Sequence, residues 1–273
     1  MSDLPRLLQG SLLLRPYVFI FLLLHLVGAA ALMGWRRTGA FTLFTWGVAF
    51  AAEVSSTRTG IPFGWYYYIP RTADRELWLL GVPFFDSLSF PFLLVASYAL
   101  AWLLLTGGRP LHQDLAGIGQ RKRERPGRGP HLVLTTFLFV FIDMVIDPVA
   151  LRGDRWFLGQ IYGYPEPGVY FGVPLANFLG WGVVGLVSMG LYQTWELRQP
   201  DAGTAAFRGR ALLCPGLYFI VLAFNLTVTF AIGEWVLGLC GVALSLPLSL
   251  WTWRMLRGPR VLGWRPRGEG IRA

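Results

Sequence analysis

Four acidic residues lie in or beside long apolar runs of this chain: Glu53, Asp86, Asp143 and Asp147. A charged side chain inside a membrane span costs about 2.5 to 3.5 kcal/mol on insertion scales, so an acid retained there usually faces the protein interior and has a task or a partner. Asp143 and Asp147 are four residues apart and share one face of a helix, which Pro148 is expected to end just after them.

Two carboxyl groups this close in a low dielectric do not readily both ionise, so one of Asp143 and Asp147 is expected to keep its proton near neutral pH. A carboxylic acid held neutral is the proton donor that an unactivated carbon-carbon double bond requires. A structural interpretation stays open, in which any of the four acids pairs with Arg58, Arg152 or Arg155, or caps a neighbouring helix.

The composition indicates that these acids belong to a membrane protein. Hydrophobic residues make up 54% of the 273 residues, charged residues only 14%, and the mean hydropathy is +0.50. No soluble domain of this length needs so many apolar residues to fill its core. We therefore predict an all-α, polytopic transmembrane helix bundle that forms one integral membrane domain over residues 1–273.

Apolar runs of about the 20 residues needed to cross a bilayer recur along the chain. The first is expected to be a retained helix, because it exceeds the apolar part of a signal peptide, about 7 to 15 residues, and Trp35-Arg36-Arg37 follows it. Seven spans are predicted, and six or eight remain open. They are approximately 16–34, 40–55, 88–105, 132–149, 174–194, 211–230 and 235–255.

The basic residues predict the orientation. With seven spans, 17 of the 24 basic residues fall on one face, which includes a loop at about 106–131 and a tail at about 256–273. By the positive-inside rule this face is cytoplasmic, so in the cell (inner) membrane the N-terminus is outside and the C-terminus inside. The stretch Arg121–Arg125 is expected to be loop rather than a nucleic-acid or anionic-lipid site.

Cys214 and Cys240 lie in late apolar runs and are expected to be buried thiols rather than a disulfide.

A motif recurs after 91 residues. Gly81 to Phe90 and Gly172 to Trp181 share G-V-P-x-x-[DN]-x-L-x-[FW]. This predicts a parallel internal repeat, in which the second and third helices correspond to the fourth and fifth. It puts Asn177 at the place of Asp86, where it could orient a water or a carboxyl group, or serve in helix packing.

The connections before these two motifs are rich in aromatic residues. An interfacial aromatic belt is one explanation. Substrate binding is the other, because an aromatic face stabilises a desolvated cation by about 2 kcal/mol or more. The residues chosen for that role are Trp65, Tyr66, Phe84 and Tyr170. Glu234 and His25 are expected to be structural.

Several of these segments together resemble a known family. They are Glu53-Val54-Ser55-Ser56-Thr57-Arg58-Thr59-Gly60, Pro62-Phe63-Gly64-Trp65-Tyr66-Tyr67, Asp143, Asp147-Pro148, Trp156 and Tyr170-Phe171-Gly172-Val173-Pro174-Leu175-Ala176-Asn177-Phe178. Over roughly residues 16–255 the chain resembles the membrane carotenoid biosynthesis proteins of the CruF type, the carotenoid 1,2-hydratases. The resemblance implies hydration of the terminal double bond of an acyclic carotenoid end, of the gamma-carotene or lycopene type, to a tertiary alcohol.

The roles of single residues follow from the residues themselves and are not carried over from the family. Asp143 or Asp147 is the expected acid and Glu53 its partner, while Asp86 and Asn177 position water. Hydration is redox-neutral, so no cofactor is expected, and no metal-ligand spacing is present. The expected partners are an acyclic carotenoid, water and membrane lipid, without nucleic acid; association with other carotenoid enzymes is left open.

Three other functions are alternatives to hydration. A retinal-binding rhodopsin needs a lysine in its last helix, and the sole lysine here is Lys122 in a loop, which excludes covalent retinal. A membrane carotene cyclase would use the same acid and carbocation but lose a proton instead of gaining water. A non-catalytic carotenoid or lipid carrier would bind pigment without changing its mass.

Overall fold

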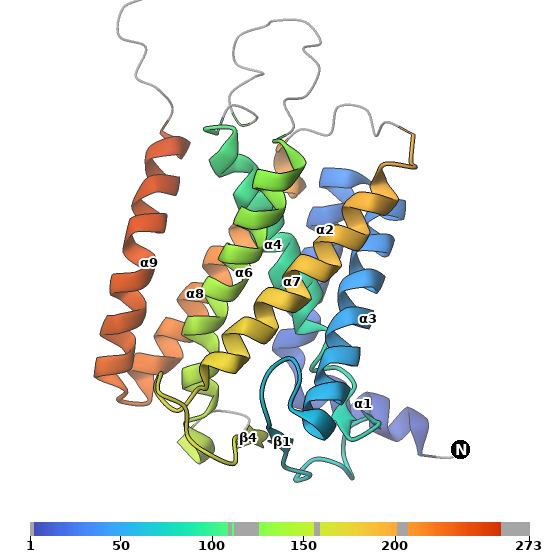
Figure 1. Ribbon diagram of the computed structural model, residues 1–273, viewed down its shortest axis with the longest axis vertical. Coiled ribbons are helices and arrows are strands. Elements are labelled where there is room, and N and C mark those ends of the chain that lie inside the picture. Colours follow the sequence, from blue (N-terminus) through green and yellow to red (C-terminus); the bar gives the residue numbers. More distant parts are fainter. Residues whose placement is uncertain (1–2, 109–110, 112–125, 156–158, 201–206, 258–273) are drawn as a thin grey trace, which may run out of the picture.

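The structure is a computed structural model, which describes residues 3–108, 111, 126–155, 159–200 and 207–257. Its helices run side by side in an all-α bundle (Figure 1). Most of the predicted basic loop and tail, Lys122 and Trp156 lie outside the described residues. The main helices are α1 (Leu4–Leu14), α2 (Pro16–Met33), α3 (Trp35–Thr59), α4 (Ser89–Leu105), α6 (Arg128–Ala150), α7 (Leu175–Glu196), α8 (Leu213–Ala231) and α9 (Trp235–Leu256).

Each of the seven predicted spans coincides with a helix from α2 to α9, which confirms the helical membrane bundle. Within the described residues, five helical segments are long and apolar enough to cross a membrane. They are α2, α6, α7, α9 and the run Gly209–Ala231, in which the short 3-10 helix η3 (Gly209–Leu212) leads into α8. α4 is apolar but has only 17 residues. The chain is therefore a multi-pass membrane protein, while its orientation stays a prediction.

The bounds of α3 differ from the expected 40–55. The helix has 25 residues because Gly34 alone reverses the chain after α2, at a φ of 83° that favours glycine. The polar residues after Gly34, which had suggested a connection, already form the first turn of α3. Pro148 also does not end its helix as predicted, since α6 continues to Ala150. A proline in the last turn removes only one backbone hydrogen bond, and the helix tolerates that loss near its end.

Helix α4 is the axis of the bundle. Every residue from Phe90 to Leu104 is buried, which explains why this segment is apolar on all sides. The helices α2, α3, α6 and α8 all pack against it. α9 lies at the edge of the bundle and contacts α8 and α6 (Figure 1).

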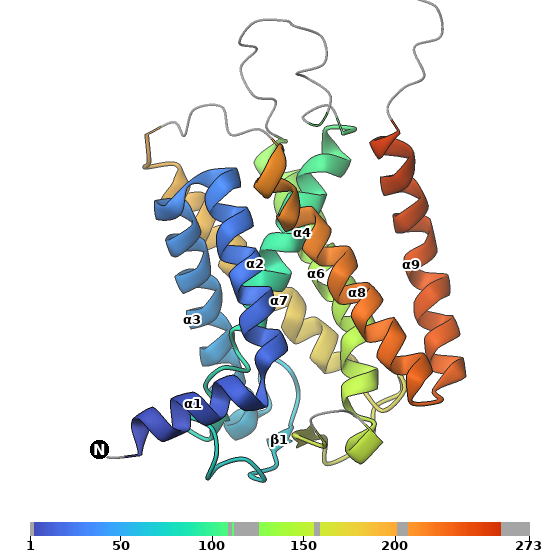
Figure 2. The same cartoon turned by 180° about the vertical axis from the view of Figure 1, so that it is seen from behind.

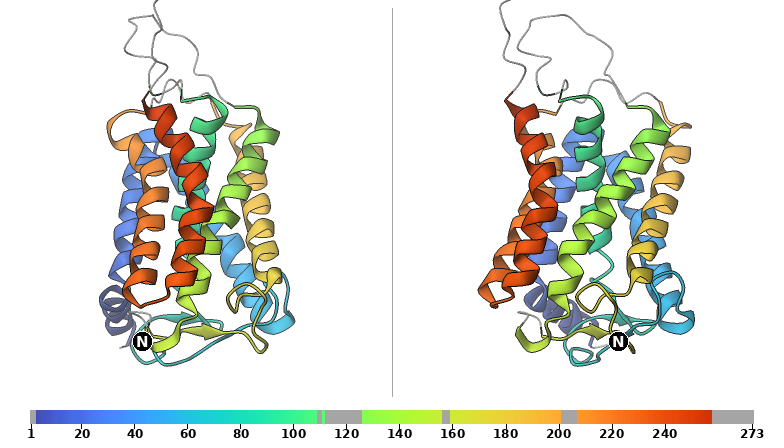
Figure 3. Two further views of the ribbon diagram at one scale, coloured as in Figure 1. Left: turned by 90° about the vertical axis from the view of Figure 1, so that its left-hand side faces the viewer. Right: turned by 60° about the vertical axis from the view of Figure 1, so that its left-hand side comes forward.

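Two long connections, residues 60–88 and 151–174, lie together at the end of the bundle that also carries α1 (Figure 3). Strand β1 (Tyr67–Tyr68) of the first pairs antiparallel with β4 (Tyr162–Gly163) of the second, with Tyr68 opposite Tyr162. The first connection also forms a hairpin of β2 (Trp78–Leu79) and β3 (Val82–Pro83), and the second a 3-10 turn, η2 (Gly153–Arg155). None of these strands was expected from the sequence.

Helix α1 was not predicted either, and it lies across the end of the bundle instead of along it (Figure 2).

The internal repeat stays a prediction. The residues after its two prolines differ in structure: α7 begins at Leu175, directly after Pro174, whereas α4 begins only at Ser89, six residues after Pro83. Cys214 and Cys240 are free thiols, as expected; Cys214 is buried, whereas Cys240 is only half-buried.

The contact between α7 and the first connection depends on Gly180. A Cβ atom there would lie 2.3 Å from Cδ1 and 2.8 Å from Cα of Phe63. We expect Gly180→Ala to lower the free energy of unfolding by about 1–3 kcal/mol through overpacking. Gly190→Ala in the same helix is the control, because no atom lies within 4 Å of its Cβ position. Thermal unfolding in detergent would measure both, and equal stability of the two variants would contradict this packing.

Candidate active site

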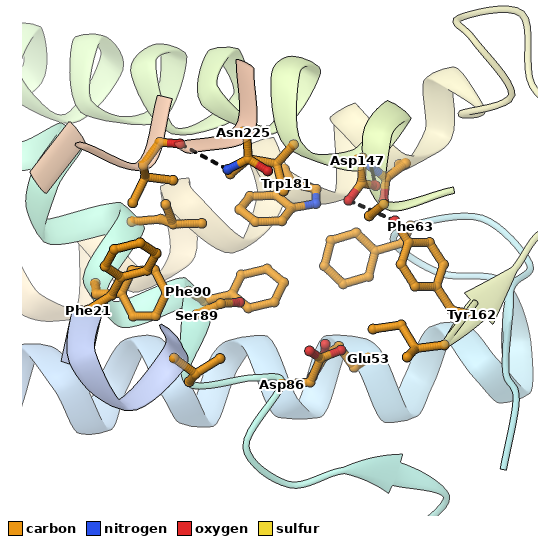
Figure 4. A pocket seen from close by; sticks show the side chains of 18 of the residues that line it. Phe21, Glu53, Phe63, Asp86, Ser89, Phe90, Asp147, Tyr162, Trp181 and Asn225 are labelled. Carbon is orange, nitrogen blue, oxygen red and sulfur yellow. Dashed lines mark hydrogen bonds between the residues drawn. The ribbon is translucent and has the colours of Figure 1, made fainter. Parts of the chain in front are cut away.

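A cavity of about 150 Å³ lies between the helices, below the two long connections. Its walls come from α2, α3, α4, α6, α7 and α8, so every helix that surrounds α4 contributes to it. The acids lie at one end, which we call the polar end, whereas the other end is mostly apolar and carries the amide of Asn225 (Figure 4). The polar end contains three of the four predicted acids, Glu53, Asp86 and Asp147, together with Asn177.

Glu53, near the end of α3, belongs to the first of two clusters of carboxyl groups. It is 4% exposed. Tyr68 donates a hydrogen bond to its Oε1 at 2.9 Å, and Ser87 donates one to Oε2. The Tyr68 hydroxyl also lies 3.4 Å from Oδ2 of Asp86, so one phenol joins the two acids. We call Glu53 and Asp86 the α3-side centre.

Asp86 has a cation as its second neighbour. Nη1 of Arg15 lies 2.7 Å from its Oδ1. Burial raises the pKa of Asp86 above its ordinary value, while the Arg15 charge opposes that rise. Among the described residues, Arg58, Arg152 and Arg155 do not pair with an acid of the site. Arg58 donates to a backbone oxygen, and the other two pair with Glu234.

Asp143 and Asp147 of α6 form the second cluster with Asn177 from the first turn of α7. The Asn177 amide donates to Oδ2 of Asp143 at 3.0 Å and to Oδ2 of Asp147 at 2.7 Å. Tyr162 and Tyr164 donate to the two oxygens of Asp147, at 3.0 and 3.3 Å. We call Asp143, Asp147 and Asn177 the α6-side centre.

The two aspartates of this centre differ in their access to the cavity. Asp147 lines it, whereas Asp143 is fully buried behind it, and its Oδ1 has no hydrogen-bond partner among the described residues. The same residues place no arginine or lysine in an ion pair with either carboxyl. Two uncompensated carboxyl groups joined by one amide are most stable when they share a proton.

Tyrosines bridge the two centres. The β1–β4 pairing places Tyr68 opposite Tyr162, with ring centroids 6.5 Å apart, and the Tyr66 ring lies 5.4 Å from Tyr68 and 6.4 Å from Tyr164. Burial raises the pKa of Tyr68 and of Tyr162 well above the ordinary value. These hydroxyl groups therefore stay protonated and donate to the carboxyl oxygens.

Aromatic rings form the wall between the two centres and the apolar end. Phe90 and Trp181 stack with their centroids 4.4 Å apart, and Phe63 packs against Phe90 at 6.0 Å. At the apolar end, Phe21 contacts Phe224 of α8. Figure 4 shows Glu53 and Asp86 across the cavity from Asp147 and Tyr162, with Trp181, Phe90 and Phe21 farther along the cavity.

The other predicted substrate-binding residues lie elsewhere, with the exception of Tyr66, which lines the cavity. Trp65 is 57% exposed. Phe84 packs against Trp46 and Phe85, and Tyr170 against Phe171 and Phe178, outside the cavity lining. The structure does not bring these three residues to the acids.

The residues expected to be structural have ordinary partners. His25 is buried and shares a hydrogen bond with Thr42, while Glu234 pairs with Arg152 and Arg155. Within the described ranges, no group of three or more His, Cys, Asp or Glu side chains is placed to hold a metal ion.

Comparison with known proteins agrees with the resemblance found in the sequence. Residues 14–248 match the model of a family described as carotenoid biosynthesis protein. The chain belongs to this carotenoid biosynthesis family. A bisanhydrobacterioruberin hydratase of Haloarcula japonica is 30% identical over 194 residues, which are 68% of this chain and 56% of that protein. The chain thus spans little more than half the length of this relative, and no solved structure matches it.

Sequence reasoning missed Tyr68, Tyr162 and Tyr164 as ligands of the carboxyl groups, and it missed Arg15. The tyrosines did carry a signal: residues 66 and 68, and again 162 and 164, have the spacing of two that puts side chains on one face of an extended strand. Arg15 carried no such signal, since it is one basic residue just before an apolar run.

The hydroxyl group of Tyr68 is expected to contribute to stability. Tyr68→Phe leaves Oε1 of Glu53 without a donor, and an unsatisfied buried acceptor costs about 1–3 kcal/mol. Tyr67→Phe is the matched control, because the neighbouring ring is 49% exposed and lies outside the cavity lining. Unfolding in detergent should show a loss of stability for Tyr68→Phe and none for Tyr67→Phe. The same loss in both variants would show that the bond to Glu53 contributes nothing.

Proposed function

We propose that this chain is a hydratase that adds water to the terminal carbon-carbon double bond of an acyclic carotenoid. The observation that carries the proposal is the pair of carboxyl centres that face each other across an aromatic cavity. The family supports a carotenoid as the substrate, and the hydratase relative supports the reaction type.

The size of the cavity fits an end group. A volume of about 150 Å³ is that of an apolar cavity known to accept a molecule as large as benzene, so it holds a few carbons and not a long polyene. The rest of the carotenoid would then leave through the apolar end, past Phe21 and Phe224, toward the bilayer. A gamma-carotene or lycopene type of end, with a terminal isopropylidene group, matches this shape.

Asp147 would be the proton donor, because it lines the cavity and shares the α6-side centre with Asp143. Its proton adds to the less substituted carbon of the double bond, and a tertiary cation forms at the neighbouring carbon. The faces of Phe90, Trp181 and Phe63 stabilise such a cation in a dry site by about 2 kcal/mol or more each when well placed.

A water oxygen then bonds to the cationic carbon and loses a proton to the α3-side centre, in which Glu53 and Asp86 share one negative charge. One proton is delivered and one is taken up, no electrons are exchanged, and the product is a tertiary alcohol. The accepted proton must return to Asp147 before the next turnover, and the hydroxyl groups of Tyr68 and Tyr162 lie between the two centres. Asn177 holds the carboxyl groups of the α6-side centre in place.

Expression in a host that accumulates lycopene or gamma-carotene tests the function. Chromatography with mass detection should show a more polar pigment, heavier by one or two waters. An isomer of unchanged mass would show a cyclase instead. Unaltered pigment that copurifies with the protein would show a carrier.

The role of the acid is tested by Asp147→Asn, which keeps the shape of the side chain and one accepting oxygen but removes the transferable proton. General acid catalysis is typically worth about 10²–10⁴-fold, so we expect hydration to fall by at least about 100-fold. Asp154→Asn is the matched control, because this aspartate of the same outer region is 80% exposed and pairs with Arg71. Full activity of Asp147→Asn at equal protein level would exclude this residue as the donor.

A further inference from the structure

Arg15 is completely buried at the junction of α1 and α2, although the reaction described above does not use it. Its Nε and Nη2 lie 2.6 and 3.1 Å from the two carboxyl oxygens of Glu76, and its Nη1 lies 2.7 Å from Asp86. One guanidinium thus binds an acid outside the cavity and an acid inside it. Breaking such a buried pair by removing one partner is costly, which makes its position well defined.

The segment that carries Glu76 is held to α1 by a further hydrogen bond, which the backbone N–H of Leu77 donates to Oγ of Ser11 at 3.0 Å. Within the segment itself, Thr72 donates to the Glu76 carboxyl group. Gly10 of α1 lies directly against the chain, because a Cβ atom there would be 1.9 Å from the carbonyl oxygen of Arg75. The N-terminal helix therefore positions Arg15 and Glu76 as one unit.

The two carboxyl centres differ in charge because of this unit. A cation touches the α3-side centre through Asp86, whereas the α6-side centre has only neutral amide and phenol donors among the described residues. We infer that Arg15 is a positioning residue that keeps one negative charge on the Glu53–Asp86 pair and thereby makes the α3-side centre the proton acceptor and the α6-side centre the donor. This inference rests on the proposed function.

The charge on Asp86 depends on all the groups that face it. Burial raises its pKa, the Arg15 charge lowers it, and the negative Glu76 raises it again. Removing Glu76 alone must therefore lower the pKa of Asp86, whereas removing both Arg15 and Glu76 must raise it, because the effect of Arg15 is the larger one. The titratable and charged groups around it are Arg15 and Tyr17 from the start of α2, Glu53 from α3, Tyr66, Tyr68 and Glu76 from the first connection, and Asp147 from α6.

The test compares the pH dependence of hydration in the wild type, Glu76→Gln and the double variant Arg15→Gln/Glu76→Gln, each purified in detergent. An acceptor must be ionised, so activity falls as the pH drops through its pKa. An opposite charge within a few ångströms shifts a carboxyl pKa by about 1–3 units. We expect this acidic limb to move down by about one pH unit in Glu76→Gln and up by about one unit in the double variant.

Two controls accompany these variants. Arg15→Lys keeps the positive charge, so the acidic limb is expected to stay near the wild-type pH. Arg71→Gln removes a surface arginine that pairs with Asp154 and should not move the limb. Glu76→Gln retains Arg15 with one carboxylate partner, so it tests the inference even if the double variant does not fold. Limbs that stay at the wild-type pH, or that move in the same direction in both variants, overturn the inference.

An infrared titration of the carboxyl band of Asp86, assigned by its loss in Asp86→Asn, gives a second readout that does not depend on turnover. The Asp86 band should move in the same two opposite directions. If the wild type forms no hydrated product, the proposed function fails; opposite band shifts would then still support control of Asp86 by Arg15. Absence of band shifts in an active enzyme would overturn the inference and leave the function intact.

Discussion

The structure depends on one electrostatic constraint: several carboxyl groups are buried together, and among the described residues Arg15 is the one cation that pairs with an acid of the cavity. Ionised carboxylates are costly in a low dielectric unless they are paired or receive hydrogen bonds. Arg15 compensates one side of the cavity, and neutral donors from Asn177 and the tyrosines serve the other. This division gives the cavity two chemically different walls. A reaction that gives a proton to a carbon and takes one from water needs such a difference.

The fold meets the constraint with segments that a simple bundle does not need. The β1–β4 pair brings tyrosines from two distant connections to the carboxyl groups, and α1 crosses the end of the bundle to fix Arg15. Helix α4 fills the centre without any charged residue, so its neighbours can contribute the polar groups. The end of the bundle that carries α1 therefore holds the carboxyl groups, while the remaining length of the bundle is mostly apolar, as the proposed hydrophobic substrate requires.

The sequence predicted the helices well, because apolar runs of membrane length are a strong and local pattern. It also found the four acids, since a charge in an apolar run is conspicuous. It failed where the position depended on contacts distant in sequence: Trp65 and Tyr170 share the aromatic character of Tyr66, yet only Tyr66 reaches the cavity. Arg15 is paired with residues 61 and 71 positions away, a distance that no local pattern encodes. The helical continuation through Pro148 was missed because one lost hydrogen bond near a helix end is tolerated.

The central claim is that the end of an acyclic carotenoid reacts between the two carboxyl centres. An experimental structure of the inactive Asp147→Asn variant with such a carotenoid bound measures this most directly. The account predicts the terminal double bond beside Phe90 and Trp181, with residue 147 on one side, Glu53 on the other and the polyene leaving past Phe224. A carotenoid whose ends both lie outside this cavity would contradict the account.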